Sequence, residues 1–279
     1  MESFHKPAPT SPSFLLSYPR PHILLITIDR ARSMNAIPMA AHWEAEAILD
    51  WFDSEPQLRV AVLTGAGTKA FSAGQDLMEQ VAFQTQTPPP RLQDRRHPPA
   101  GFLGLSRRVG KKPIVAAVNG FALGGGFETC LNCDLVIASP EASFGLPETG
   151  VGLYAAAGGL PRLVRSCGIQ LASEIAMTGR RLTSAEALSL HLINQISATP
   201  ASVVDESLAV AEKIARMSPD AIIVTRHGLR EAWAEGSVER AYQRTAERFD
   251  RLLFEGENTK IGIRAFGLKE RPVWVPSKL

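Results

Sequence analysis

Short apolar runs alternate with helical patterns over the first two thirds of the chain. Residues 22–28 (HILLITI) are mostly β-branched or leucine and end at charged residues, so they predict a buried strand. Residues 60–63, 113–118 and 134–139 predict three more strands. Residues 38–52 begin with a proline and carry apolar residues at helical spacing, which predicts a helix. Strands separated by helices indicate an α/β fold.

The last third of the chain has a different pattern. Residues 201–217, 219–235 and 237–255 show helical periodicity with few strand signals. Residues 1–21 are rich in Pro and Ser and predict a loose arm, and the Pro-rich residues 85–100 predict a mobile surface loop. The pattern therefore divides the chain into a flexible N-terminal arm (1–21), an α/β core (22–199), a helical C-terminal region (200–276) and a terminal tripeptide (277–279).

Composition excludes several classes of protein. The chain has 279 residues, of which 45% are hydrophobic, so it can form a core without disulfides or metal ions. Its net charge of +2 gives no reason to expect nucleic-acid binding. The apolar runs are far shorter than the ~20 residues of a membrane span. Cys130 and Cys133 form a C-x-x-C pair without a second pair, which favours packing over metal binding.

The chain ends in Ser277, Lys278 and Leu279. A C-terminal S-K-L tripeptide is an address that the peroxisomal import receptor reads. We therefore expect the protein to be located in the peroxisome, with the import receptor as a partner. Chance occurrence of the tripeptide is the alternative.

The stretch with the most chemical information is NGFALGGGFE at residues 119–128. A strand ends there, three glycines follow and a helix begins, so a ligand can approach the main chain closely. The first N–H groups of a helix have no acceptor within it and can bind a phosphate or a developing oxyanion. The glycine spacing is not that of a dinucleotide-binding motif, and no Walker lysine follows. Tight packing of helix on strand is the alternative explanation.

Two glutamates accompany this stretch. Glu128 follows Gly125 by three residues, so it lies on the same helical face, although it could simply be a partner of the helix dipole. Glu148 comes 20 residues later in FGLPETG, where a glutamate in a turn commonly faces solvent. The spacing leaves room for a helix, a return strand and a turn, which could bring the two carboxylates together for acid–base chemistry.

The motifs around these residues resemble those of the crotonase superfamily, specifically enoyl-CoA hydratases and isomerases. The resemblance runs from about His22 to Trp274 and includes VAVLTGAGTKAFSAGQDL, KKPIVAAVNGFALGGGFE and CDLVIASPEASFGLPETGVG. It implies an α/β crotonase (ClpP-like) spiral of ββα units whose helical C-terminal region forms homotrimers, often stacked as hexamers. It also implies an acyl-CoA substrate, no separate cofactor and no metal.

The same resemblance implies roles for individual residues. The main-chain amides of Gln75 and Gly125 would form an oxyanion hole for the thioester carbonyl, and Glu128 and Glu148 would be the catalytic pair. Three residues would bind the CoA moiety, the last often from a neighbouring subunit: Ala73, Asp76 and Lys269.

Three positions depart from the family pattern. Met78 stands where a basic residue is often found, which removes one expected CoA contact. Ala155 replaces a proline of many hydratases and should reshape the acyl pocket. Ala156 stands where dienoyl-CoA isomerases carry an aspartate, which argues against that activity.

We therefore expect hydration of a 2-enoyl-CoA to a 3-hydroxyacyl-CoA, with Glu128 activating water and Glu148 delivering a proton to C2. The main alternative is an enoyl-CoA isomerase that uses Glu148 as its sole shuttling base. Thioester hydrolysis and dehydration of a hydroxyacyl-CoA are also open. Some relatives bind RNA or act as scaffolds, but the near-neutral charge and the two glutamates argue against these roles. The sequence leaves the acyl chain and the pathway open.

Overall fold

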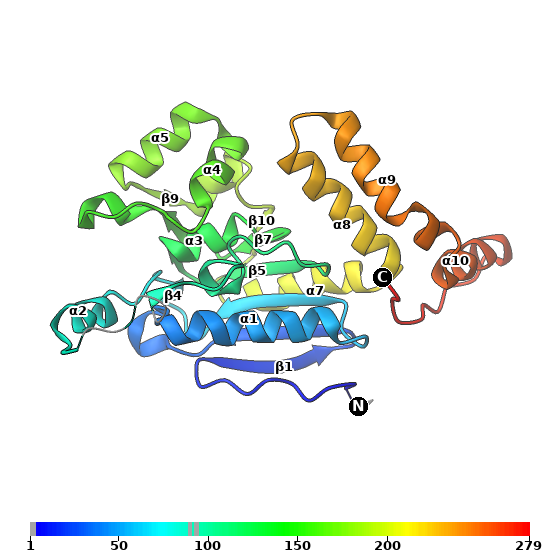
Figure 1. The fold of residues 1–279 in the computed structure, drawn as a ribbon, viewed down its shortest axis with the longest axis horizontal. Helices are drawn as coiled ribbons and strands as arrows, with labels where there is room; N and C mark the ends of the chain where they lie inside the picture. Colours follow the sequence, from blue (N-terminus) through cyan, green and yellow to red (C-terminus); the bar gives the residue numbers. More distant parts are fainter. Residues whose placement is uncertain (1–3, 89–90, 92–94) are drawn as a thin grey trace.

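The computed structural model describes residues 4–88, 91 and 95–279. Within these residues the strands form two sheets (Figure 1). The larger sheet contains, in spatial order, β1 (Phe14–Arg20), β2 (Ile23–Ile28), β3 (Val60–Gly65), β5 (Ile114–Val118), β7 (Leu135–Ala138) and β10 (Gln195–Ile196). The smaller contains β4 (Ala70–Ser72), β6 (Phe121–Leu123), β8 (Ser143–Gly145) and β9 (Arg181–Thr183). Neighbouring strands run parallel except at the edges, where β1 and β9 are antiparallel.

Successive segments repeat one unit: a strand in the larger sheet, a strand in the smaller sheet, then a helix. β3 and β4 lead to α2 (Leu77–Thr85), and β5 and β6 lead to α3 (Gly125–Cys130). β7 and β8 lead through the 3-10 helix η4 (Pro147–Val151) to α4 (Gly159–Cys167). This repeat is the ββα spiral, so the predicted fold class is confirmed. The other helices are η1 (Ala31–Ser33), α1 (Met39–Ser54), η3 (Phe102–Gly104), α5 (Ile169–Thr178), α6 (Ser184–Ser189), α7 (Val203–Ala215), α8 (Pro219–Ala234), α9 (Val238–Phe254) and α10 (Glu257–Leu268).

The larger sheet is covered on both faces, which is why its central strands read as continuous apolar runs. In β3, Val60 and Val62 belong to a buried cluster with Leu208 of α7. Ala61 and Leu63 point the other way, into the main core that α1 shares. Alternate residues of one strand thus hold α7 and α1 on opposite faces.

The structure corrects one boundary of the predicted organisation. The loose arm expected over residues 1–21 is wrong for its second half, because Phe14–Arg20 forms strand β1 against β2. Phe14 is buried while Leu15 is exposed, a strand alternation that Pro19 and Pro21 obscure in the sequence. Proline is tolerated there because β1 is an edge strand. The loop expected over residues 85–100 lies partly outside the described residues.

The three helices expected in the C-terminal region are observed as α7, α8 and α9, and α10 follows them. Two arginines join α8 to the core: Asp134 accepts from Nε of Arg226 and from a terminal nitrogen of Arg230, each at 2.9 Å. Arg226 also donates to the main-chain oxygens of Val109 and Gly110, each at 2.6 Å. Beyond these contacts, α8 to α10 extend away from the sheets (Figure 1). The outer helices expose several large apolar side chains: Val238, Tyr242, Phe254, Ile263 and Phe266.

The C-terminal tripeptide lies against the body of the protein. Ser277 donates a hydrogen bond to the Asp220 carboxylate, and Lys111 Nζ donates to the main-chain oxygen of Leu279 at 2.7 Å. The peroxisomal address stays a prediction. Among the described residues, no helix combines the length and apolar character needed to cross a bilayer.

Candidate active site

The first candidate oxyanion donor is the main-chain N–H of Gln75. Ile37 pairs with Gln75 as in a parallel sheet: it donates to the oxygen of Gly74 at 2.9 Å and accepts from the N–H of Asp76 at 2.9 Å. Because successive peptide groups of an extended chain point to opposite sides, the N–H of Gln75 faces away from Ile37. Among the described residues this N–H has no acceptor.

The second donor is the N–H of Gly125, the first residue of α3, which has no acceptor within the helix. The two donors are brought together by glycines. A Cβ placed on Gly74 would lie 3.4 Å from the nitrogen of Gly125 and 2.9 Å from the oxygen of Leu123, and Gly74 has φ +91°. Only glycine permits this approach in that conformation, so the two amides that the resemblance points to lie next to each other.

Glu128 lies one helical turn beyond Gly125, and its side chain points into the protein. It is 2% exposed, and its Oε1 accepts a hydrogen bond of 2.8 Å from the N–H of Gly159. Burial raises the pKa of Glu128 to about 7, and repulsion from Glu148 adds to the rise, although the hydrogen bond from Gly159 opposes it. Near neutral pH this carboxyl group can therefore either give or take a proton.

Glu148 comes from the 3-10 helix η4 and meets the same glycine turn from the other side. A Cβ on Gly124 would lie 2.9 Å from its Oε1, so the carboxylate lies against the residue before Gly125. Its Oε2 is buried and has no hydrogen-bond partner among the described residues. Burial raises the pKa of Glu148. An unpartnered buried carboxylate oxygen is suited to proton transfer with a bound molecule.

The structure thus gathers four of the residues named from the sequence: Gln75, Gly125, Glu128 and Glu148. Two free N–H groups can stabilise a negative oxygen, and two carboxyl groups with raised pKa values stand beside them. This set of groups can polarise a carbonyl group and move protons on either side of it.

The residues expected to bind CoA are more scattered. Ala73 precedes the glycine of the oxyanion turn. Asp76 caps α2 by accepting from the N–H groups of Met78 and Glu79, each at 3.2 Å, and pairs with Arg30 at 3.1 Å. In this structure Asp76 stabilises the turn that carries Gln75. Lys269 ends α10, which lies across the molecule from α2 (Figure 1), so it does not join these groups within one protomer.

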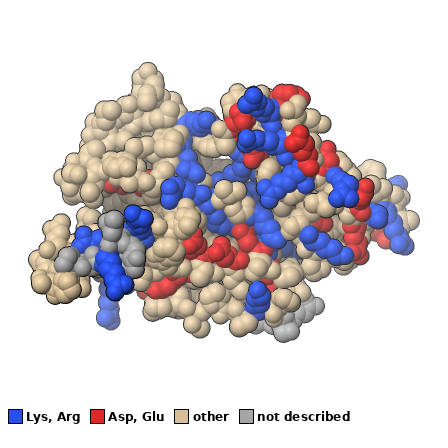
Figure 2. Space-filling model, in the orientation of Figure 1, with Lys and Arg blue, Asp and Glu red and all other residues tan. Residues whose placement is uncertain are grey.

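A cavity of about 260 Å³ opens beside Glu148. Its walls are mostly apolar and come from α4, α5 and the segment before them: Leu146, Ala155, Leu160, Val164, Ile169, Ala172, Ala176 and Met177. Figure 2 shows that the lobe built from α4 and α5 carries almost no charged atoms on this face. The cavity is suited to an uncharged acyl group bound beside Glu148.

Two further residues touch the site without having been singled out from the sequence. His42 and His97 both hydrogen-bond to Oε1 of Gln75, at 2.9 and 3.1 Å. The sequence does mark His42, because it is a polar residue in the buried apolar stripe of α1, between Met39 and Ala45. A polar residue in an apolar stripe needs a partner. His97 lies in the Pro-rich segment, where no periodicity marks it.

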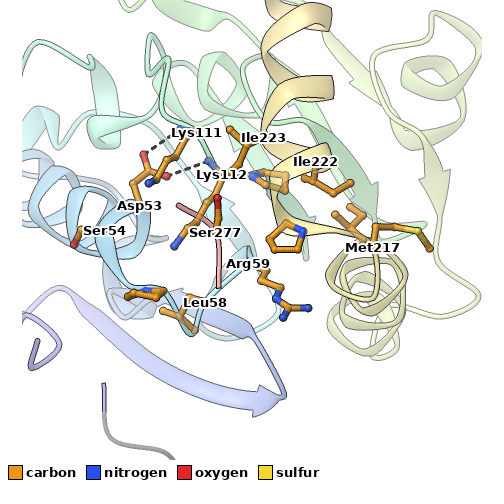
Figure 3. A pocket seen from close by; sticks show the side chains of 14 residues that line it. Asp53, Ser54, Leu58, Arg59, Lys111, Lys112, Met217, Ile222, Ile223 and Ser277 are labelled. Carbon is orange, nitrogen blue, oxygen red and sulfur yellow. Dashed lines mark hydrogen bonds between the residues drawn. The ribbon is translucent and has the colours of Figure 1, made fainter. Parts of the chain in front are cut away.

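A second hollow, of about 40 Å³, lies between the end of α1 and α8 (Figure 3). Lys112, one of the cations that line it, has a structural role: its Nζ donates to the main-chain oxygens of Phe52 and Glu55 at 2.7 and 2.5 Å, and so caps α1. In the described part of the chain, no group of three or more His, Cys, Asp or Glu side chains could hold a metal ion.

Comparison with known proteins agrees with this geometry. A family model described as enoyl-CoA hydratase/isomerase matches residues 20–276. The chain is 45% identical over 280 aligned positions to the mevalonyl-coenzyme A hydratase SIDH of Beauveria bassiana, covering 99% of this chain and 100% of the relative. It is 36% identical to the carnitinyl-CoA dehydratase of Escherichia coli K12, covering 90% and 94%.

Solved structures agree as well. An enoyl-CoA hydratase from Mycobacterium tuberculosis superimposes with a TM-score of 0.84 at 32% identity, covering 96% of this chain and 100% of that one. One from Bacillus anthracis gives 0.83 at 29% identity, covering 95% and 100%. With the family model spanning nearly the whole chain, the protein belongs to the enoyl-CoA hydratase/isomerase family of the crotonase superfamily.

Proposed function

We propose that the protein adds water to, and removes it from, the C2–C3 bond of a CoA thioester. One observation carries the proposal: at one glycine turn, two main-chain N–H groups that have no acceptor among the described residues meet the buried carboxyl group of Glu128 and the half-buried one of Glu148. An isomerase needs one shuttling base, for which Glu148 would suffice. The presence of Glu128, buried and oriented by Gly159, favours chemistry that also handles water.

The steps follow from the geometry. Water attacks C3 of the enoyl thioester while Glu128 takes its proton, and the electron pair of the double bond moves onto the thioester oxygen. The N–H groups of Gln75 and Gly125 stabilise this enolate, each donor being worth ~3 kcal/mol in comparable sites. Glu148 then gives a proton to C2. In the elimination direction Glu148 removes the C2 proton and Glu128 protonates the departing hydroxyl group.

The raised pKa values support this exchange of roles. Glu128, with a pKa of about 7, can be protonated near neutral pH, which suits protonation of a leaving hydroxyl group. Because the two carboxyl groups repel each other, a single proton shared between them is favoured over none. One acid and one base are then present in either direction.

We propose a short, branched acyl group of the mevalonyl type as the substrate. Two relatives, at 45% and 42% identity over nearly the whole chain, are named mevalonyl-coenzyme A hydratases. A mevalonyl thioester carries a hydroxyl group and a methyl group at C3, so loss of water gives a conjugated, branched enoyl thioester. Ala155 is a small residue in the wall of the cavity beside Glu148, which leaves room for a branch.

The test is incubation of the protein with mevalonyl-CoA and, separately, with unbranched 3-hydroxybutyryl-CoA, followed by mass analysis. The expected product of mevalonyl-CoA is lighter by one water and absorbs as a conjugated thioester. We expect kcat/KM to favour the branched substrate at least ~10-fold, as one group in a fitted pocket does. Unchanged mass with altered retention would indicate isomerisation, and free CoA would indicate hydrolysis. Either result would contradict the proposal.

We further propose that the protein acts as a homo-oligomer in which Lys269 binds the CoA moiety held by a neighbouring protomer. The exposed apolar side chains of α9 and α10, such as Phe254 and Phe266, support an interface there. Light scattering should give a mass of three or six chains. Lys269→Ala should raise KM for the CoA thioester with little change in kcat. A monomer with full activity would contradict this assembly.

A further inference from the structure

We propose that His42 and His97 are positioning residues, which hold the oxyanion donor N–H of Gln75 in place by binding the side chain of the same residue. This inference rests on the proposed function, because it concerns the N–H group that stabilises the enolate. It assigns a role to two side chains that the steps above do not use.

The contacts converge on one amide group. Oε1 of Gln75 accepts from Nε2 of His42 at 2.9 Å and from Nε2 of His97 at 3.1 Å. Its Nε2 donates to the main-chain oxygen of Ile37 at 3.0 Å and to the sulfur of Met39 at 3.5 Å. These partners come from α1, from the segment before η3 and from the strand-like pairing at Ile37. The side chain of Gln75 is therefore fixed from three directions.

The direction of each bond follows from the chemistry of the groups. The N–H of Leu103 donates to Nδ1 of His42 at 3.0 Å, so the ring hydrogen of the neutral imidazole lies on Nε2 and faces Gln75. The oxygen of an amide only accepts, so Nε2 of His97 is also a donor. Burial lowers the pKa of His42 to about 3, which keeps this ring neutral across the working range.

The two histidines also pack against a ring that contacts the second oxyanion donor. The ring of Phe102 packs edge-on against His42, with centroids 4.6 Å apart, and against His97 at 5.8 Å. A Cβ on Gly125 would lie 2.5 Å from this ring, so Phe102 lies directly against the glycine that supplies the other N–H. One packed group thus sets the spacing of both donors, and a stabilising donor works only at the right position.

The variant His97→Phe tests the inference, because it keeps an aromatic ring against His42 and Phe102 but removes the donor. We expect kcat to fall about 10-fold with KM nearly unchanged, since the lost contact acts on charge that develops in the transition state. His97→Gln returns an N–H near the position of Nε2, and we expect it to stay within about threefold of the wild type.

The matched control is Trp43→Phe. Trp43 Nε1 donates to the main-chain oxygen of Arg96 at 3.2 Å, so this variant loosens the same segment without touching Gln75. We expect wild-type kinetics from it. In addition, Gln75→Leu retains the main-chain N–H but loses every side-chain hydrogen bond of Gln75. The double variant of Gln75→Leu and His97→Phe should lose no more kcat than Gln75→Leu alone, because both substitutions break the same hydrogen bond between Gln75 and His97.

A second measurement separates this inference from the proposed function. A cinnamoyl-CoA with an electron-donating ring substituent absorbs at longer wavelength when hydrogen bonds polarise its carbonyl group. We expect wild-type protein to shift this band to the red, and His97→Phe to shift it less at similar Kd. If the wild type shifts the band but catalyses neither addition nor loss of water, the proposed function fails while the positioning role stands. Wild-type kcat and band shift in His97→Phe, or a loss confined to KM, would overturn the positioning role.

Discussion

The two glutamates of the candidate active site lie in contrasting surroundings on either side of one glycine turn. Glu128 sits on a helix, is 2% exposed and receives a hydrogen bond from the N–H of Gly159. Glu148 sits on a 3-10 helix at the edge of an apolar cavity and keeps one oxygen without a partner among the described residues. The fold thus fixes one carboxyl group in orientation and leaves the other available to the bound molecule.

This contrast indicates a division of labour. A water molecule must be aimed at C3, which requires an oriented carboxyl group. A proton on C2 must be exchanged directly with the substrate, which requires an unpartnered oxygen close to the oxyanion donors. Three substitutions test this division of labour, Glu148→Gln, Glu128→Gln and Gly159→Ala, with expected effects that decrease in that order.

The largest effect is expected for Glu148→Gln. Removal of the group that exchanges the C2 proton should lower hydration about 10⁴-fold, the upper end for a general acid or base. Any double-bond migration should be lost as well. The loss of enoyl thioester absorbance measures the rate. The matched control is Glu141→Gln, an exposed glutamate shortly before β8, which should retain the wild-type rate. More than a tenth of wild-type activity in Glu148→Gln would refute its role.

Glu128→Gln should separate the two functions. Hydration should fall about 10³-fold, because no base remains to activate the water. Exchange of the C2 hydrogen with solvent should continue, because Glu148 and both N–H donors are untouched. Incubation of a saturated acyl-CoA in D₂O with mass analysis measures the exchange. If exchange and hydration fall together, the two carboxyl groups act as one unit and the division of labour is wrong.

The same variant should also be more stable than the wild type, but only at high pH. The folded-state pKa of Glu128 is about 7 against an ordinary 4.5, so the native state binds this proton more tightly than the unfolded state. Stability therefore falls as pH rises through this range, and the ionised buried carboxylate costs up to about 3 kcal/mol above it. Urea unfolding at pH 8 should show this gain for Glu128→Gln, and unfolding at pH 5 should not. An equal gain at both values would contradict the assigned pKa.

The smallest effect is expected for Gly159→Ala. Its N–H donor remains, but the new Cβ would lie 2.5 Å from Cγ of Glu128 and push the carboxyl group aside. We expect kcat to fall about 10-fold and stability by about 1–3 kcal/mol, as for an overpacked site. Gly150→Ala is the control, because a Cβ there meets no atom within 4 Å. Equal kinetics of the two variants would show that orientation of Glu128 is unimportant.

The sequence predicted the parts of the structure that follow from local patterns. β3 and β5 were evident because both of their faces are buried, and α1 because of its apolar spacing and its proline. Asp76 accepts the first N–H groups of α2, as an aspartate directly before a helix commonly does. Glu128 and Gly125 were linked by helical spacing alone.

Other features depended on contacts between distant segments. The spiral itself came only from the resemblance, since no local pattern states which strand enters which sheet. Whether Glu148 faces solvent or the glycine turn depends on how η4 packs against Gly124, 24 residues earlier. His97 lies in a segment without periodicity, and its partner Gln75 is 22 residues away. β1 was missed because prolines mask an edge strand.

The pairing at Asp134 has a mechanical consequence. Besides holding the two arginines of α8, this carboxylate accepts the N–H of Ile114, the first residue of β5, at 2.9 Å. β5 runs directly into the turn that precedes the glycines. Asp134 therefore couples the outlying helices directly to the strand that leads into the glycine turn, so a partner bound to those helices acts on the position of β5.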